Sequence, residues 1–366
     1  MKIGITGADG LLGYHFRALL HSSGGCEPCL AGRQTFADQA ALDRFVGGLD
    51  GIAHLAGMNR GDEGEVEATN TALAASLVAA LERTGSAPIV VYANSTHIER
   101  DTGYGRGKRA AAEHLSRWAG ASGAKFCDLV LPNVFGEFGR PYYNSVVSTF
   151  CHQIAAGETP EIHVDGVIEL VHAQDVGRRI QSAIDEGKSG QVRMAGTPIR
   201  VSALLERLRS LHGEYVGQVV PDLGDPLDLR LFNTLRSYMF PGHYPVVLNL
   251  RSDDRGSLFE AVKALGSGQT FMSSTHPGIT RGNHYHLRKL ERFLVVAGDA
   301  EIRLRRLFSD DVKIFRVSGG CPSYIDMPTF YTHSITNVGE GDTITLFWAN
   351  EIFDSDDPDT YAEAVV

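Results

Sequence analysis

The chain has 366 residues, a length that suits two domains, each with a sizeable core. Its 34 Lys and Arg residues stand against 44 Asp and Glu residues, and the deficit in both halves argues against a nucleic-acid-binding face or an anionic-membrane anchor. No apolar run is long enough to cross a bilayer, and a predicted strand begins at residue 2. We therefore expect a cytoplasmic protein without a secretory segment, membrane insertion or a nucleic-acid partner.

Short apolar runs alternate with helical patterns as far as residue 245. The helical patterns include residues 68–82 and 108–119, and the apolar runs are residues 2–6, 28–32, 51–56, 88–93 and 126–132. This rhythm predicts βαβ units, and therefore an α/β Rossmann-like parallel sheet with helices on both faces.

The cysteines are odd in number and scattered, which indicates reduced thiols in the core rather than disulfides. Cys26 and Cys29 have the spacing of redox or zinc sites. Because no second pair exists and the two lie where a strand is expected, we interpret them as structural.

A glycine-rich turn follows the first predicted strand, with the spacing Thr6-Gly7-x-x-Gly10-x-x-Gly13. Glycines at such a turn let the backbone approach a pyrophosphate, and the N–H groups of the next helix, including those of Leu11 and Leu12, can bind the anion. The spacing is typical of the short-chain dehydrogenase/reductase (SDR) superfamily, although an ordinary glycine-rich turn is the alternative. We predict a bound dinucleotide.

Arg33 decides which dinucleotide we expect. The second strand runs into Leu30-Ala31-Gly32-Arg33 without an Asp or Glu for the ribose 2′-hydroxyl, and the Arg suits a 2′-phosphate, so NADPH is favoured over NADH. Further on, Leu55-Ala56-Gly57 and Asn70 resemble the cofactor-binding positions of extended SDR enzymes that act on nucleotide sugars.

Tyr104 and Lys108 are the predicted catalytic pair. Four positions apart, they share a helical face, so the ammonium can lower the pKa of the phenol and reach the nicotinamide ribose. A solvated helix face is the alternative reading. Ser95 is preferred over Thr96 as the hydroxyl partner, although the eight residues between Ser95 and Tyr104 are fewer than in most members of the superfamily.

The loop Leu131–Pro141 resembles the superfamily's loop beside the nicotinamide and the sugar. Asn133 and Arg140 are candidates to bind sugar or diphosphate oxygens, and a solvated turn is the alternative for Arg140.

Pro and Gly cluster around residues 240–245, which predicts a domain boundary between residues 1–245 and 246–366. Beyond it the pattern is nearly all strand, as in residues 292–296, 300–307, 312–317 and 343–348, and predicts an all-β sandwich or small barrel.

Four residues of this second part have the composition of a metal site: His284, His286, Glu291 and His333. Three imidazoles and a carboxylate suit Zn²⁺, with Fe²⁺, Mn²⁺ or Ni²⁺ also possible. Their two segments resemble the paired motifs of the cupin barrels, except that Phe330 replaces a glycine, and we expect this to alter a turn but not the ligand spacing. The alternative is an empty cupin whose histidines only fill the barrel.

The whole chain resembles CapF and its relatives, a family of bifunctional capsular-polysaccharide enzymes in which an extended SDR is fused to a C-terminal cupin. The segments that carry the resemblance are Asn133–Gly139, Asp254–Ser257, Thr280–His286 and Thr343–Glu351. The resemblance implies a UDP-2-acetamido-2,6-dideoxy-4-ketohexose as substrate. The cupin would epimerise C3, and the SDR would reduce C4 with NADPH to UDP-N-acetyl-6-deoxy-L-talose, on the route to N-acetyl-L-fucosamine.

The acid and base of the cupin reaction remain open. Lys289 is the hypothesis, and Tyr285 is also close along the chain. Two other readings compete: a 4-ketoreductase whose cupin is only a metal-stabilised dimerisation module, and a binding or regulatory protein without turnover. We expect a homodimer, because barrel edges in such cupins often pair between chains.

Overall fold

The computed structural model describes all residues 1–366 and divides into two compact units. The first unit consists of Met1–Thr149 and Ile162–Ala203, and the second of Phe150–Glu161 and Leu204–Val366. The helices after residue 203 therefore group with the C-terminal strands, whereas the sequence pattern places them before residue 245. A functional division into residues 1–245 and 246–366 stays a prediction. No helix of the chain combines the length and the apolar character that crossing a membrane requires.

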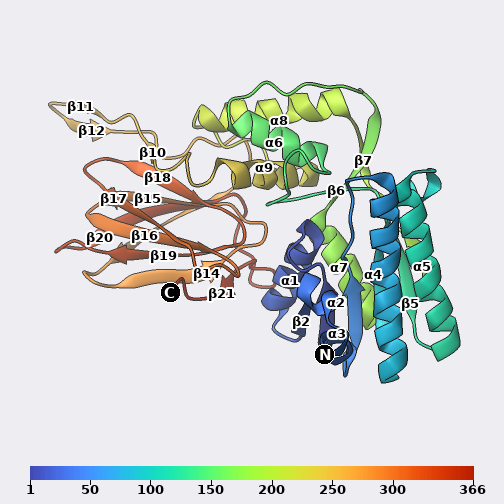
Figure 1. Cartoon of the computed structure of the whole chain (residues 1–366). Helices are drawn as coiled ribbons and strands as arrows, with labels where there is room; N and C mark the ends of the chain where they lie inside the picture. The colour runs from blue at the N-terminus through green and yellow to red at the C-terminus, as the bar shows by residue number, and fades with distance from the viewer. The chain divides into compact units, whose positions relative to one another are not determined.

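The first unit is built around a six-stranded parallel sheet with the order β2-β1-β3-β4-β5-β8 (Figure 1). Its strands are β1 (Lys2–Thr6), β2 (Glu27–Ala31), β3 (Gly51–His54), β4 (Ile89–Ser95), β5 (Phe126–Leu131) and β8 (Gly190–Arg193). A small second sheet consists of β6 (Asn133–Phe135), β7 (Val167–His172) and β9 (Thr197–Arg200). The order reverses between β1 and β3, the kind of position at which open α/β sheets bind ligands.

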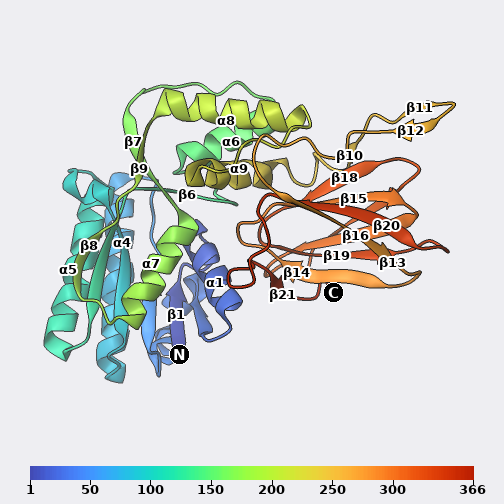
Figure 2. The same cartoon turned by 180° about the vertical axis from the view of Figure 1, so that it is seen from behind.

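Helices cover both faces of the large sheet, which confirms the predicted α/β class (Figure 2). Phe16 and Ile180 pack on one face and Leu77 and Trp118 on the other, each in a separate apolar core. The first face is covered by α1 (Leu11–Ser23) and α7 (Ala173–Asp185), and the second by α3 (Gln39–Val46), α4 (Glu63–Thr84) and α5 (Gly103–Ser122). Two short helical segments, α2 (Arg33–Ala37) and η1 (Thr96–Glu99), follow β2 and β4.

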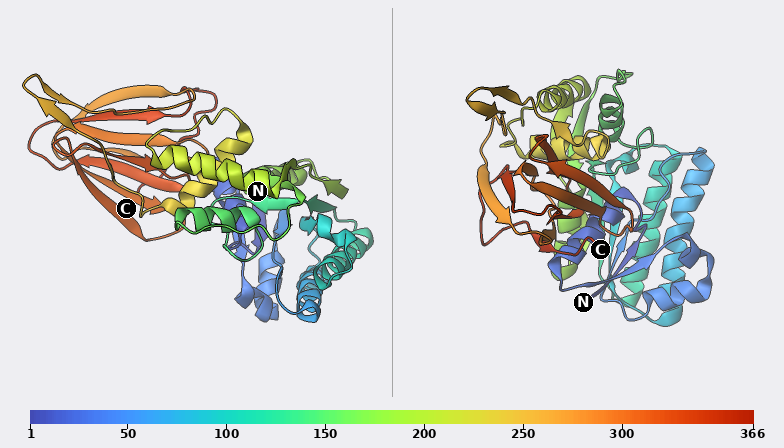
Figure 3. Two further views of the ribbon diagram at one scale, coloured as in Figure 1. Left: turned by 90° about the horizontal axis from the view of Figure 1, so that it is seen from above. Right: turned by 90° about the vertical axis from the view of Figure 1, so that its left-hand side faces the viewer.

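The second unit contains the predicted β barrel, formed by two five-stranded sheets (Figure 3). One sheet has the order β10-β18-β15-β20-β13 and the other β17-β16-β19-β14-β21. Phe293, Ile302, Ile325 and Phe347 belong to the apolar core of this barrel. The strands are β10 (Val246–Val247), β13 (Gln269–Thr275), β14 (Thr280–Tyr285), β15 (Glu291–Ala297), β16 (Asp299–Arg306), β17 (Val312–Ser318), β18 (Ser323–Met327), β19 (Tyr331–Asn337), β20 (Thr343–Ala349) and β21 (Tyr361–Ala362), with a separate hairpin of β11 (Arg251–Asp253) and β12 (Gly256–Leu258).

A buried polar network joins the helices of the second unit to the barrel. Arg292 of β15 donates to both carboxylate oxygens of Asp326 on β18, at 2.7 and 2.9 Å. Tyr215 donates its hydroxyl proton to Asp326 at 2.6 Å, and Arg236 donates to the Met327 carbonyl at 2.9 Å. Because Tyr215 lies on α8 (Val201–Val216) and Arg236 on α9 (Pro226–Met239), the network explains why these helices group with the barrel. The remaining helix is α6 (Val146–Ala155).

Candidate active site and metal centre

The turn between β1 and α1 needs its glycines because other backbone atoms approach it closely. A Cβ at Gly13 would lie 2.2 Å from the Gly7 carbonyl oxygen, and a Cβ at Gly7 would lie 2.8 Å from the Ala56 nitrogen. Gly10, the N-cap residue of α1, provides no side-chain cap, so the first N–H groups of the helix are available to an anion. The turn therefore fits the pyrophosphate of a dinucleotide.

Thr6 ties this turn to the loop after β3. Its hydroxyl oxygen accepts from the N–H groups of Leu55 at 3.0 Å and Ala56 at 3.1 Å, so its proton is donated to His54 Nδ1 at 2.8 Å. Burial, assisted by the Lys108 charge, lowers the pKa of His54 to about 3. Thr6, with a neutral His54 as its proton acceptor, therefore ties the start of the glycine-rich turn to the loop that contains Leu55 and Ala56.

Arg33 and Asn70 occupy different environments. The Arg33 side chain is exposed at the first position of α2, immediately beyond β2, where a 2′-phosphate could meet it. Asn70 is buried and donates to the Met58 carbonyl at 2.7 Å, while its Oδ1 accepts from the Met58 N–H at 3.0 Å. A Cβ at Gly57 would lie 2.8 Å from this Oδ1, so Asn70 supports the loop from beneath. Direct contact of Asn70 with the cofactor stays a prediction.

The predicted catalytic residues Tyr104, Lys108 and Ser95 come together at the start of α5. The hydroxyl of Thr102 caps this helix by accepting from Gly105 N–H, which places Tyr104 in the first turn and Lys108 one turn later. The Lys108 ammonium lies 5.8 Å from the centroid of the Tyr104 ring and donates to the Ala93 carbonyl at 2.7 Å. Ser95, the partner preferred over Thr96, lies close enough to Tyr104 to act on the pKa of its phenol.

Burial shifts the pKa values of Tyr104 and Lys108 in opposite directions. It raises the pKa of Tyr104 to about 12, although Ser95 acts in the other direction, so the lowering expected from Lys108 is not found. It lowers the pKa of Lys108 to about 8, with the Asp128 carboxylate opposing the shift. At neutral pH the phenol therefore holds its proton, and most of the lysine is charged.

The predicted substrate residues Asn133 and Arg140 are both exposed. Asn133 donates to the Glu169 carbonyl at 3.2 Å, and the Arg140 guanidinium lies 5.2 Å from the centroid of the Tyr143 ring. The binding roles of Asn133 and Arg140 stay predictions.

Glu137, between them, is a residue that sequence reasoning missed. It is buried, and its Oε2 lies 3.0 Å from His172 Nε2 and 3.8 Å from His15 Nε2. Burial alone would raise its pKa, but His172 and His15 lower it to about 2. The sequence feature that could have revealed Glu137 is its position as the one charged residue in the otherwise apolar run Val134–Phe138.

The four predicted metal ligands converge in the barrel. Their ligand atoms all lie within 4.8 Å of one another. The Glu291 Oε2 atom is 3.1 Å from His286 Nε2, 3.3 Å from His333 Nε2 and 3.5 Å from His284 Nε2. Pairing of β14 with β19 sets His284 opposite His333, while Glu291 begins β15 in the other sheet.

Backbone carbonyls orient two of these imidazoles. His286 Nδ1 lies 2.6 Å from the Asp359 carbonyl oxygen and His333 Nδ1 lies 3.1 Å from that of Tyr331, so both nitrogens act as donors. Their Nε2 lone pairs then face the centre, as in protein metal sites. Burial would raise the pKa of Glu291, but the three histidines around its carboxylate hold that pKa well below the usual range. Three imidazole nitrogens and one carboxylate fit a divalent metal such as Zn²⁺.

The turn at Phe330 differs from our expectation. Phe330 adopts φ +64°, the left-handed conformation that a glycine adopts readily. Its N–H donates to the His286 carbonyl at 2.8 Å, and its own carbonyl accepts from Leu307 N–H at 2.9 Å. The glycine-type backbone is therefore retained at a cost of about 1–2 kcal/mol, and the expectation of an altered turn was wrong.

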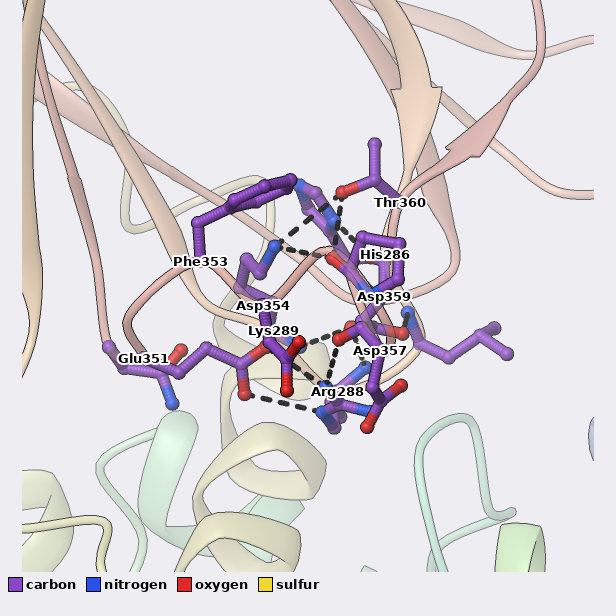
Figure 4. A network of polar contacts seen from close by, with 12 residues as sticks. His286, Arg288, Lys289, Glu351, Phe353, Asp354, Asp357, Asp359 and Thr360 are labelled. Carbon is purple, nitrogen blue, oxygen red and sulfur yellow. Dashed lines mark hydrogen bonds and ion pairs between the residues drawn. The ribbon is translucent and has the colours of Figure 1, made fainter.

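Lys289 and Tyr285 lie near the ligands along the chain but contact other groups. The Lys289 ammonium donates to the Pro358 carbonyl at 2.7 Å (Figure 4). Tyr285 stacks on Tyr361 with ring centroids 5.2 Å apart. An acid or base role of Lys289 stays a prediction.

Comparisons with known proteins match the whole chain. The NAD dependent epimerase/dehydratase family matches residues 3–196, and the polysaccharide biosynthesis C-terminal domain family matches residues 251–361. A relative from Pseudomonas aeruginosa, the UDP-2-acetamido-2,6-beta-L-arabino-hexul-4-ose reductase, is 35% identical over 100% of this chain and 99% of its own length.

Two solved structures are also similar. The capsular polysaccharide assembling protein CapF from Staphylococcus aureus has a TM-score of 0.63 at 30% identity, with 100% of both chains covered. The UDP-N-acetylglucosamine 4-epimerase from Bacillus cereus has a TM-score of 0.52 at 18% identity over 58% of this chain and 82% of its own, a likeness of fold alone.

Proposed function

Because the chain belongs to the NAD dependent epimerase/dehydratase family, and over its full length to the CapF-like proteins, we propose that it is a bifunctional nucleotide-sugar enzyme. It epimerises C3 of a UDP-2-acetamido-2,6-dideoxy-4-ketohexose in the cupin barrel. It then reduces the C4 ketone with NADPH to UDP-N-acetyl-6-deoxy-L-talose, toward UDP-N-acetyl-L-fucosamine for a surface polysaccharide. The observation that carries this proposal is the presence, in one chain, of the Ser95–Tyr104–Lys108 set and a convergent His₃Glu cluster.

The reductase half rests on Tyr104. When bound, reduced nicotinamide supplies the hydride that adds to C4. Tyr104, which is protonated at neutral pH, donates its hydroxyl proton to the C4 oxygen as the alkoxide develops. The Lys108 ammonium, 5.8 Å from the centroid of the Tyr104 ring, would favour the resulting phenolate by its charge, and the neighbouring Ser95 hydroxyl would orient the phenol. Arg33 holds the 2′-phosphate, and Asn133 and Arg140 hold the sugar or diphosphate.

The epimerase half rests on the acidity of the C3 proton, which lies α to the ketone. A divalent metal held by His284, His286, Glu291 and His333 would supply Lewis acidity that polarises a carbonyl. Lys289 is our candidate for moving the C3 proton, and to do so its Nζ must leave the Pro358 carbonyl. Metal binding requires an ionised Glu291 and unprotonated imidazole nitrogens. The pKa of Glu291 is held well below its usual range and burial lowers that of His333, whereas Glu291, acting against burial, raises that of His286.

The test is turnover of a UDP-4-keto-6-deoxy-N-acetylhexosamine in deuterated water, with the product examined by mass spectrometry and NMR. Deuterium at C3 without NADPH reports epimerisation, and NADPH oxidation reports reduction. Absence of NADPH oxidation would instead favour a binding or regulatory protein without turnover.

Variants separate the two halves of the reaction. The double substitution His284→Ala with His286→Ala should abolish C3 exchange while ketone reduction continues. If deuterium exchange at C3 is unchanged in this variant, the barrel is not the epimerase and the dimerisation-module alternative is favoured. If Lys289→Ala exchanges as fast as the parent, the role of Lys289 is wrong.

We also propose a cytoplasmic homodimer. Strand β13 is an edge of its sheet and exposes apolar side chains, with Phe271 40% and Met272 68% exposed. An apolar strand edge of this kind favours pairing with another chain. The molar mass from light scattering tests the stoichiometry.

A further inference from the structure

The C-terminal segment beyond β20 is attached to the metal-ligand loop through one buried residue, Asp359 (Figure 4). Its carboxylate accepts from the N–H groups of Leu287 at 3.1 Å, Arg288 at 2.9 Å and Lys289 at 2.8 Å. These three N–H groups directly follow His286 in the chain. One carboxylate therefore satisfies the backbone of the loop that leads from His286 toward Glu291.

The backbone of Asp359 acts on His286 itself. The Asp359 carbonyl oxygen lies 2.6 Å from His286 Nδ1 and accepts its proton, while His286 Nε2 faces Glu291. Asp359 has φ +42°, a left-handed conformation uncommon for residues other than glycine but tolerated by Asp and Asn. Strain of this kind persists where surrounding contacts impose it. The conformation turns the carbonyl and the carboxylate toward neighbouring parts of the same loop.

Contacts on either side of Asp359 keep the segment in place. Arg288 pairs with Glu351 at 3.2 Å and with Asp357 at 2.8 Å. After Asp359, β21 pairs with β14, so that Tyr361 lies opposite Tyr285. The position of Asp359 is thus determined from both directions.

We propose that Asp359 is a positioning residue for the metal centre: its carbonyl fixes the tautomer and ring orientation of His286, and its carboxylate fixes the loop that follows. This inference rests on the metal site of the proposed function. Groups that orient a metal-bound imidazole change metal affinity by roughly 10- to 100-fold when they are altered. Asp359 does not contact the substrate in this account, and its effect reaches the reaction only through His286.

The test compares metal affinities of full-length variants by competition between Zn²⁺ and a chromophoric chelator. Asp359→Asn retains a side chain that tolerates the left-handed backbone but cannot accept all three N–H groups through a carboxylate. Asp359→Gly suits φ +42° and removes the side chain entirely, so it serves as a second variant should the first fold poorly. Asp356→Asn is the matched control, because it makes the same chemical change at an exposed position of the same segment.

We expect both Asp359 variants to bind Zn²⁺ roughly 10- to 100-fold more weakly than the parent, with Asp356→Asn unchanged. The Co²⁺-loaded Asp359 variants should show shifted ligand-field bands, a readout that loss of stability alone would not move. Parental affinity and parental bands in both Asp359 variants would overturn the positioning role while leaving the metal site intact. A parent chain that binds neither ion would overturn the metal site, and this inference with it.

Discussion

The Nε2 atoms of His284 and His333 lie 3.2 Å apart, although 49 positions separate the two residues along the chain. Two imidazole nitrogens that face each other at this distance repel unless a proton or a cation lies between them. Glu291 Oε2 is 3.3 Å from one and 3.5 Å from the other, so negative charge lies at the same point. A divalent cation would satisfy all these groups at once.

Metal removal should therefore destabilise the barrel. A ligand that binds only the folded state adds about 4 kcal/mol to the unfolding free energy when its concentration is 1,000 times its Kd. We expect chelation to lower the melting temperature, and Zn²⁺ to restore it. Calorimetry of the parent and of the His284→Ala/His333→Ala double variant checks this. The melting temperature of the double variant should not change with chelation or with added Zn²⁺. An unchanged melting temperature in the parent as well would contradict a bound metal.

NADPH affinity should fall as the pH rises through about 8. Burial lowers the pKa of Lys108 to about 8, so the ammonium is present below that pH and is lost above it. With the charge gone, attraction to the cofactor and its anionic groups weakens. Fluorescence titration of the free enzyme between about pH 7 and pH 9 measures the effect, since binding to free enzyme reports free-enzyme pKa values. In Lys108→Met the pH step should disappear, and a parent without any step would contradict the assignment.

Gly13→Ala should weaken NADPH binding, because the new Cβ would lie 2.2 Å from the Gly7 carbonyl oxygen and displace the start of α1. Losing one charge-assisted hydrogen bond of about 1.5–3 kcal/mol weakens binding roughly 10- to 150-fold. Gly120→Ala in α5 is the control, since its Cβ meets nothing within 4 Å. Titration of both variants decides the point: equal affinities would mean that the turn does not hold the cofactor.

Local sequence patterns predicted the parts of the molecule that local geometry determines. Strands β1, β3 and β5 begin where their apolar runs begin, because alternation between strand and helix is visible within a few residues. The candidate metal cluster could be predicted because His-x-His places both side chains on one side of the chain, and because His333 follows a turn of recognisable composition. In each case the signal spans fewer than about ten residues.

Contacts between distant segments were not predictable in this way. Asp359 is 73 positions from His286, and it belongs to a run with three other Asp residues, of which Asp356 is exposed. Composition cannot show which carboxylate of such a run is buried, since that depends on where the last strand pairs. The Arg292–Asp326 pair was missed for the same reason, because an alternating strand pattern assigns both positions to a face without revealing that the face is covered by α8.

Asp326→Asn should cost much of the stability of the second unit. Removing one partner of a buried pair leaves Arg292 charged in the core, at a cost of about 3–5 kcal/mol. Burial would raise the pKa of Asp326, but Arg292 holds it below the usual value. The stability that the ionised Asp326 contributes is therefore present at neutral pH and lost in acid. In Asp326→Asn this pH dependence of the unfolding free energy should be absent.

Urea unfolding measures the change, with Asp253→Asn as the control because its pair with Arg255 is exposed on the β11–β12 hairpin. The control should unfold like the parent, and an Asp326→Asn variant that also unfolds like the parent would contradict the role of the pair. Since Tyr215 of α8 and Arg292 of β15 bond to the same carboxylate, the helical and barrel signals should shift together. If the unfolding midpoint of the helix signal stays at the parental urea concentration while that of the barrel fluorescence shifts, Asp326 does not couple the helices to the barrel.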